Sequence, residues 1–157
     1  MKRLFYFAYG SNLNTTRLRS RIGNAKIHRV HRLQNWELVF NCSGFANIQP
    51  APGKVVEGVL YEITSDQLND LDRIEGFYRK EFFDIEDGGL AIVYVGLNRS
   101  IWDFLPNLSY LNIVLDGLEE HNLLKTYNEV VDFKDKNYKL KFGSRHKKKA
   151  IRSVNIQ

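Results

Sequence analysis

The chain opens with an unbroken run of apolar and aromatic side chains over residues 4–9, which is typical of a buried strand. The run stops at Gly10, and the small polar residues that follow it are typical of a turn. Asn14 and the two threonines after it are good helix N-caps before a basic, helix-forming stretch. The pattern therefore predicts a strand, a tight turn and a helix in immediate succession.

Three further segments alternate apolar with polar positions and are expected to be strands with one exposed face: residues 26–33, 36–40 and 55–63. Between the last two, residues 43–53 contain two prolines and two glycines, so the pattern predicts a loop there. Gly58 interrupts the last alternating segment, which indicates a bulge or the close approach of another backbone.

A capping box begins the best-defined helix, with Thr64 as the N-cap and Gln67 at the third helical position. Leu68 and Leu71 follow at the spacing of an apolar helical stripe. Gly76 stands where a C-terminal cap glycine is expected. The pattern therefore predicts a helix that runs from the threonine to the glycine.

The remaining patterns predict a hairpin and two more helices. Residues 78–86 and 90–95 are strand-like and are joined by an Asp-Gly-Gly turn, and helices are expected over 110–120 and 123–133. Many strands interrupted by a few helices predict an α+β fold. We expect a mixed, strongly twisted sheet that curls toward a small β-barrel and has a few short flanking helices.

Charge divides the chain into two parts. From residue 134 onward there are nine lysines and arginines and one aspartate, against 14 basic and 17 acidic residues before that point. We therefore expect a globular domain over 1–133 and a solvated basic tail over 134–157 that contributes little to the core. Binding of a nucleic acid by this tail, through release of counterions, is an alternative function that stays open.

The rest of the composition excludes several classes of protein. No apolar run approaches the roughly 18–20 residues that a membrane helix needs, so no membrane partner is expected. The lone Cys42 allows no internal disulfide, which fits a cytoplasmic protein, and we interpret it as a small buried side chain rather than a nucleophile. The four histidines show no metal-ligand spacing, so no metal site is expected.

Candidate chemistry lies in the first turn and in one carboxylate. A strand that ends in small residues and opens a helix directs several backbone N–H groups at one point, which suits an anion or a developing oxyanion. Glu75 ends the helical stripe, where partial burial and the helix dipole are expected to raise the pKa of a carboxyl group toward neutrality. A simple ion pair with a nearby arginine is the ordinary alternative, and Asp72 is a rival candidate for the base.

Three motifs occur in one order: Tyr-Gly-Ser-Asn at 9–12, Gly-Val-Leu-Tyr at 58–61 and Asp-Arg-Ile-Glu-Gly at 72–76. With them the chain resembles the γ-glutamylcyclotransferase family, whose fold is AIG2-like, over most of its body. The resemblance implies a reaction without a cofactor, in which the α-amine of a γ-glutamyl substrate attacks its own γ-carbonyl. The products are 5-oxoproline and a released amino acid or amine.

The resemblance also implies roles for particular residues. Glu75 would be the general base and acid, which takes a proton from the α-ammonium group and delivers it to the leaving nitrogen. Tyr110 would hydrogen-bond the substrate from a later helix. The end of the first strand and its turn would line the substrate pocket: Tyr6, Phe7, Ala8, Tyr9, Gly10 and Ser11. The protein would be a monomer or a homodimer, and a non-catalytic binder that has kept the pocket is the remaining alternative.

Overall fold

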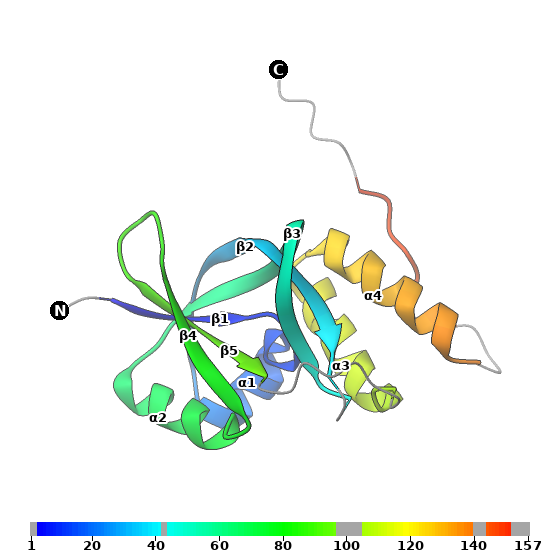
Figure 1. The fold of residues 1–157 in the computed structure, drawn as a ribbon. Helices are drawn as coiled ribbons and strands as arrows, with labels where there is room; N and C mark the ends of the chain where they lie inside the picture. Colours follow the sequence, from blue (N-terminus) through cyan, green and yellow to red (C-terminus); the bar gives the residue numbers. More distant parts are fainter. Residues whose placement is uncertain (1–2, 42–43, 97–104, 140–143, 152–157) are drawn as a thin grey trace.

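The computed structural model describes residues 3–41, 44–96, 105–139 and 144–151. The strands are β1 Leu4–Ala8, β2 Lys26–Phe40, β3 Ala46–Glu62, β4 Tyr78–Asp84 and β5 Leu90–Gly96. The helices are the 3₁₀ helix η1 Ser11–Leu13, α1 Thr15–Ile22, α2 Ser65–Ile74, α3 Leu108–Glu120 and α4 Leu124–Asn137. The strands form one sheet in the order β2-β3-β1-β5-β4, in which only β1 and β5 pair in parallel among the described strands (Figure 1). The predicted α+β fold with a mixed sheet is therefore confirmed.

The sheet is strongly twisted, and it curls at the end of β1 (Figure 1). β3 and β5 are separated by β1 in the sheet order, yet they meet beyond its last residue. There the side-chain oxygen of Asn47 on β3 accepts a hydrogen bond of 2.8 Å from the backbone N–H of Gly96 on β5. The sheet does not close into a barrel, because β2 and β4 remain its two edge strands.

The loop predicted over 43–53 is wrong from Ala46 onward, where β3 begins and pairs with β2. This part of β3 pairs with β2 alone among the described strands, so its other side makes no ladder hydrogen bonds. A proline, which has no N–H group to donate, is tolerated in a strand where the missing donor would face such an unpaired side. Gly53, at φ 80°, lies in a bulge opposite Asn35, whose side-chain oxygen accepts its N–H at 3.0 Å. β2 runs through this bulge and unites two segments that were predicted as separate strands.

Side chains of β1 alternate between two cores. Tyr6 and Ala8 face the core that α1, α3 and α4 complete, whereas Phe5 and Phe7 face a second core inside the curl of the sheet. Gly58 on β3 allows this packing, because a Cβ atom there would lie 2.4 Å from the carbonyl oxygen of Ala8. The predicted close backbone approach at Gly58 is confirmed.

The capping box at the start of α2 is confirmed in both directions. The Thr64 hydroxyl accepts the N–H of Gln67 at 3.2 Å, and the Gln67 side chain accepts the N–H of Thr64 at 3.0 Å. The predicted cap glycine is wrong, because α2 ends at Ile74 with Glu75 at φ −95° as its C-cap, and Gly76 is not left-handed. The chain instead turns directly into β4, where the N–H of Tyr78 donates to the carbonyl of Glu75 at 2.9 Å.

The basic tail is not detached from the domain in the part that the structure describes. α4 continues past the predicted boundary, and Lys134 is only 2% exposed while its ammonium group donates to Asn112 at 2.7 Å and to Ser144 at 2.8 Å. His146 is equally buried, and its Nε2 atom lies 2.7 Å from a carboxylate oxygen of Asp116. The expectation that the tail contributes little to the core is wrong for Lys134 and His146, and the division at residue 133 stays a prediction.

Basic residues of the tail also pair with the acidic surface of α3 and α4. The pairs are Arg145 with Asp116 at 2.6 Å, Lys148 with Asp132 at 3.1 Å and Lys149 with Glu119 at 2.9 Å. Nucleic-acid binding by the tail would require these basic side chains to be free, whereas each of them is paired with an acidic side chain of the same protein. Within the described residues, no helix has the length and apolar character needed to cross a membrane.

His146→Ala should lower the free energy of unfolding by about 1–3 kcal/mol, because it deletes a buried hydrogen-bonding side chain and leaves Asp116 with one partner fewer. Urea denaturation followed by circular dichroism measures the change. Lys147→Ala, at the exposed neighbouring position, is the matched control and should leave the midpoint within error. Equal midpoints for the two variants would show that the tail does not stabilise the fold.

Candidate active site

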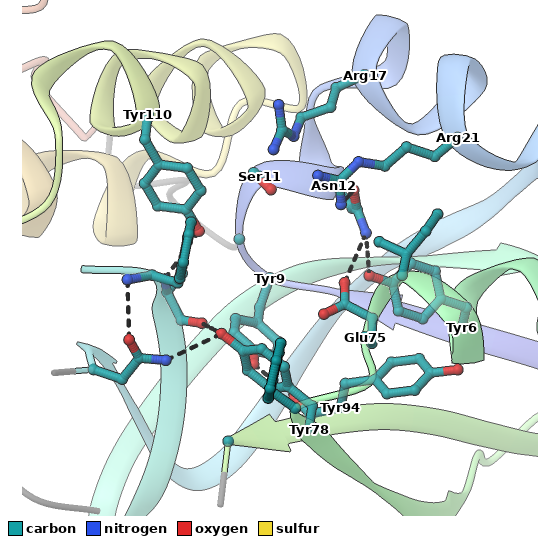
Figure 2. Close-up of a pocket in the computed structure, with 17 residues that line it drawn as sticks. Tyr6, Tyr9, Ser11, Asn12, Arg17, Arg21, Glu75, Tyr78, Tyr94 and Tyr110 are labelled. Atoms are coloured by element: carbon teal, nitrogen blue, oxygen red, sulfur yellow. Dashed lines mark hydrogen bonds between the residues drawn. The ribbon is translucent and has the colours of Figure 1, made fainter. Parts of the chain in front are cut away.

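A cavity of about 630 Å³ lies where the end of β1, the end of α2 and the start of α3 meet (Figure 2). Most of the residues predicted for the site line this cavity: Tyr6, Tyr9, Gly10, Ser11, Glu75 and Tyr110. They come from segments far apart in the sequence, so the fold brings the first turn and the candidate base to one place. The volume is in the range of pockets that hold small organic ligands.

Phe7 and Ala8, expected in the same lining stretch, do not line the cavity. The ring of Phe7 points into the second core, where it contacts His31 and Phe83 at centroid distances of 5.6 and 6.1 Å. The methyl group of Ala8 is fully buried in the first core. The resemblance suggested a continuous lining stretch, whereas Phe7 and Ala8 are packed into the second and the first core respectively and so do not reach the cavity.

The turn after β1 is a short 3₁₀ helix that leads directly into α1. The N–H of Leu13 donates to the carbonyl of Gly10 at 3.1 Å, and the side-chain oxygen of Asn14 then caps α1 by accepting the N–H of Arg17 at 3.1 Å. The first N–H groups of a helix have no acceptor within it. Ser11 starts this turn and lines the cavity, so its N–H needs an acceptor from outside the helix.

Ala46 connects the turn to two tyrosines of the cavity wall. Its N–H donates to the hydroxyl oxygen of Tyr110 at 2.9 Å, and its carbonyl accepts a hydrogen bond of 3.1 Å from the hydroxyl of Tyr78 (Figure 2). A Cβ atom on Gly10 would lie 2.9 Å from the Cβ atom of Ala46. The glycine is thus required for the turn to pack against the residue that positions both tyrosines.

Glu75 is half-buried at the C-terminal end of α2, and its carboxylate points into the cavity (Figure 2). The side-chain amide of the buried Asn12 donates to this carboxylate at 3.4 Å and to the hydroxyl of Tyr6 at 2.9 Å. Burial raises the pKa of Glu75 above its ordinary value, while Arg21 and Arg17 act in the opposite direction. The site therefore holds a positioned carboxylate that can exchange a proton nearer neutrality than a surface glutamate.

Arg17 and Arg21 bring two positive charges to the cavity from one face of α1 (Figure 2). Arg21 donates to the side-chain oxygen of Asn12 at 3.3 Å. The Nε atom of Arg17 is buried without a hydrogen-bond partner among the described residues, and burial lowers the pKa of this arginine. Sequence reasoning missed both residues, although two arginines spaced by four directly after the turn were a usable signal.

Asp72, the rival base, has a different position. It is not part of the cavity lining, and it accepts hydrogen bonds from Tyr94 at 2.7 Å and from Lys80 at 2.9 Å. Partial burial raises the pKa of Asp72, but these two hydrogen bonds outweigh it and hold the pKa below the ordinary value. Asp72 therefore stays ionised and positions Tyr94, which lines the cavity.

Further lining residues were not predicted from the sequence: Asn12, Asn41, Phe45, Ala46, Ile74, Phe77, Tyr78, Tyr94 and Gly96. The lone Cys42 lies outside the described residues. Among those that the structure does describe, no group of three or more His, Cys, Asp or Glu side chains is placed to hold a metal ion.

The fold and the sequence of the site correspond to a known class of protein. The family model described as gamma-glutamyl cyclotransferase, AIG2-like, matches residues 6–107, which include the first turn, Gly58 and Glu75. The chain therefore belongs to the gamma-glutamyl cyclotransferase, AIG2-like family, and it is an enzyme of the γ-glutamylcyclotransferase type.

Individual relatives agree with this assignment. Human gamma-glutamylcyclotransferase is 32% identical over 140 residues, which cover 79% of this chain and 74% of the human protein. The bovine gamma-glutamylcyclotransferase is 29% identical over the same shares of the two chains. A solved structure of a gamma-glutamyl cyclotransferase has a TM-score of 0.70 and 29% identity, and the match covers 83% of this chain and 87% of that one.

Proposed function

We propose that this enzyme converts γ-glutamyl amino acids or amines to 5-oxoproline by intramolecular aminolysis, with Glu75 as the general base and acid. One observation carries the proposal: a half-buried carboxylate with a raised pKa shares a small-ligand cavity with the N-terminal end of a glycine turn. Such an arrangement suits a substrate that carries both an ammonium group and a carbonyl group. The reaction needs no cofactor, because the nucleophile belongs to the substrate.

The proposed reaction conserves protons. Glu75 takes a proton from the α-ammonium group, and the free amine attacks the γ-carbonyl carbon to close a five-membered ring. The carbonyl oxygen becomes an oxyanion, which the N–H of Ser11 stabilises. The bond to the leaving nitrogen then breaks as Glu75 returns the proton to that nitrogen. The ring nitrogen still carries two hydrogens at this point, so it loses the second one to Glu75, which passes it to the released amine. The products are 5-oxoproline and an ammonium group, and Glu75 ends ionised, as it began.

The remaining lining residues hold the substrate in this pose. The hydroxyl oxygen of Tyr110 already accepts the N–H of Ala46, so its own proton can be donated to a substrate oxygen. Arg17 and Arg21 supply the positive charge that the α-carboxylate of a γ-glutamyl group requires. Ring closure within one molecule proceeds at a high effective molarity, so positioning and proton transfer supply most of the rate enhancement.

Arg21→Gln should raise KM for γ-glutamyl substrates about 10–100-fold, because it deletes a charge-assisted contact to the substrate carboxylate. The same change should shift the ascending limb of the pH–rate profile to higher pH, since this guanidinium group lowers the pKa of Glu75. Arg19→Gln is the matched control, because Arg19 is exposed on the same helix and does not line the cavity. Identical kinetics for the two variants would contradict the role given to Arg21.

A direct test of the proposed function uses a panel of γ-glutamyl amino acids and γ-glutamyl amines, with 5-oxoproline measured by mass spectrometry. We expect release from at least one member of the panel and little release by Glu75→Gln. A non-catalytic binder would bind panel members in calorimetry without releasing 5-oxoproline. That result would overturn the proposal.

A further inference from the structure

Three large apolar side chains are exposed at the edge of the cavity, and we call them the apolar rim. Ile74 is 38% exposed, Phe45 is 48% exposed and Phe77 is 88% exposed, and all three line the cavity. When a ligand covers a phenylalanine side chain that is almost fully exposed to water, apolar surface is removed from water and binding becomes more favourable. The rim therefore marks a place where the ligand itself is expected to be apolar.

The rim lies beside the groups that carry the proposed reaction. Ile74 is the last residue of α2 and Phe77 follows in the connection to β4, so the two stand on either side of Glu75 in the sequence. Phe45 comes from the turn between β2 and β3, and its ring meets Tyr110 edge-on at a centroid distance of 5.2 Å. The charged side chains among the described lining residues are Glu75 and the two arginines of α1, so the rim itself adds no charge.

We propose that the apolar rim binds the side chain of the residue that leaves, and that the enzyme prefers γ-glutamyl amino acids with a large apolar side chain. This inference rests on the proposed function. The glutamyl half must place its amine at Glu75 and its carbonyl at the first turn, both of which lie in the cavity. The leaving residue is the part of the substrate that extends to the exposed edge, where Ile74 and Phe77 stand.

The expected size of the preference follows from the area that can be covered. Burial of one methylene group favours binding by about four-fold, and a closed hydrophobic pocket distinguishes one methylene by about 10–200-fold. The rim is open on one side, as the exposure of Phe77 shows. We therefore expect kcat/KM for γ-glutamyl-leucine to exceed that for γ-glutamyl-glycine by about 10–100-fold, and γ-glutamyl-aspartate to be the poorest substrate.

The experiment measures kcat/KM of the full chain for the glycine, leucine, phenylalanine and aspartate members of the γ-glutamyl series. Phe77→Ala should reduce the leucine-to-glycine ratio about ten-fold, and Phe77→Leu should restore most of it. Phe82→Ala is the matched control, because Phe82 on β4 is 55% exposed but does not line the cavity. That control should keep the wild-type ratio.

Two results overturn the proposal: equal kcat/KM for leucine and glycine in the wild-type enzyme, or an unchanged ratio in Phe77→Ala. Calorimetry with glutaryl-leucine and glutaryl-glycine separates this outcome from failure of the proposed function, because these compounds lack the α-amine and cannot cyclise. Tighter binding of glutaryl-leucine that Phe77→Ala abolishes supports the rim even where no 5-oxoproline forms. Release of 5-oxoproline with no preference for the leucine substrate over the glycine substrate would support the proposed reaction and contradict the role given to the apolar rim.

Discussion

Glu75→Gln should reduce turnover of γ-glutamyl substrates by roughly 10²–10⁴-fold, the usual contribution of general acid–base catalysis. The amide keeps the size of the side chain but cannot accept the proton of the α-ammonium group. Substrate affinity should change far less, because the turn, Tyr110 and the arginines, to which we assign binding of the glutamyl group, still line the cavity. Steady-state kinetics with 5-oxoproline detection measure both quantities.

The pH dependence gives a second readout of the same residue. The pKa of Glu75 in the fold is raised by burial, so wild-type activity should increase with pH as this carboxyl group ionises, and the residual activity of Glu75→Gln should lack that limb. A raised carboxyl pKa also means that ionisation costs stability, a cost that is absent at low pH and grows as pH rises through the pKa of the folded state. At neutral pH the variant should therefore be as stable as the wild type or slightly more stable.

Asp72→Asn is the matched control, because it makes the same carboxylate-to-amide change on the same helix but outside the cavity lining. The activity of Asp72→Asn should fall less than that of Glu75→Gln, because the change affects the cavity only through the hydrogen bond to Tyr94. The ascending limb of its pH–rate profile should stay at the wild-type pH. Wild-type turnover in Glu75→Gln on every γ-glutamyl substrate would exclude Glu75 as the base. A loss of the limb in Asp72→Asn would transfer that role to Asp72.

Gly10→Val is expected to have the second largest effect, with turnover reduced roughly 10²-fold. A Cβ atom at this position would lie 2.9 Å from that of Ala46, so the turn or Ala46 must move. Ala46 fixes Tyr110 and Tyr78, and displacement of a positioned group by 1 Å can cost about 10²-fold in rate. The free energy of unfolding should fall by about 1–3 kcal/mol, as is typical of overpacking. Kinetics and urea denaturation measure the two losses.

A compensating change tests the cause of this effect. Gly10→Ala should lose activity through the same contact, and Ala46→Gly in the same chain should recover part of it, because it removes the methyl group that the new side chain meets. A double variant that is no more active than Gly10→Ala would show that the turn needs its glycine for another reason.

The sequence predicted correctly those elements that depend on residues close together in the chain. The capping box of Thr64 and Gln67 and the glycine turn after β1 depend on neighbouring residues, and both are present in the structure. Residues 46–53 were predicted as a loop because prolines disfavour a ladder, and only the sheet order shows that this part of β3 pairs with β2 alone among the described strands. Local composition could not reveal that arrangement.

The site and the tail likewise contain features that depend on residues distant in the sequence. Glu75 could be chosen from a helical stripe, but the direction of Arg17 and Arg21 depends on how the turn sets α1 against the cavity. The burial of His146 depends on Asp116, thirty residues earlier in the sequence. Charge counting predicted a solvated tail because it cannot show that acidic residues of α3 lie opposite the basic ones.

The central position of β1 has a consequence for synthesis of the protein. Although β1 is made first, it pairs with residues of β3 and β5, and its last partner in β5, Ile92, follows much later in the chain. On the ribosome β1 therefore stays unpaired, with its aromatic side chains exposed, until both β3 and β5 have emerged. The glycine turn cannot be fixed before that moment. We expect the cavity to be among the last parts of the protein to form.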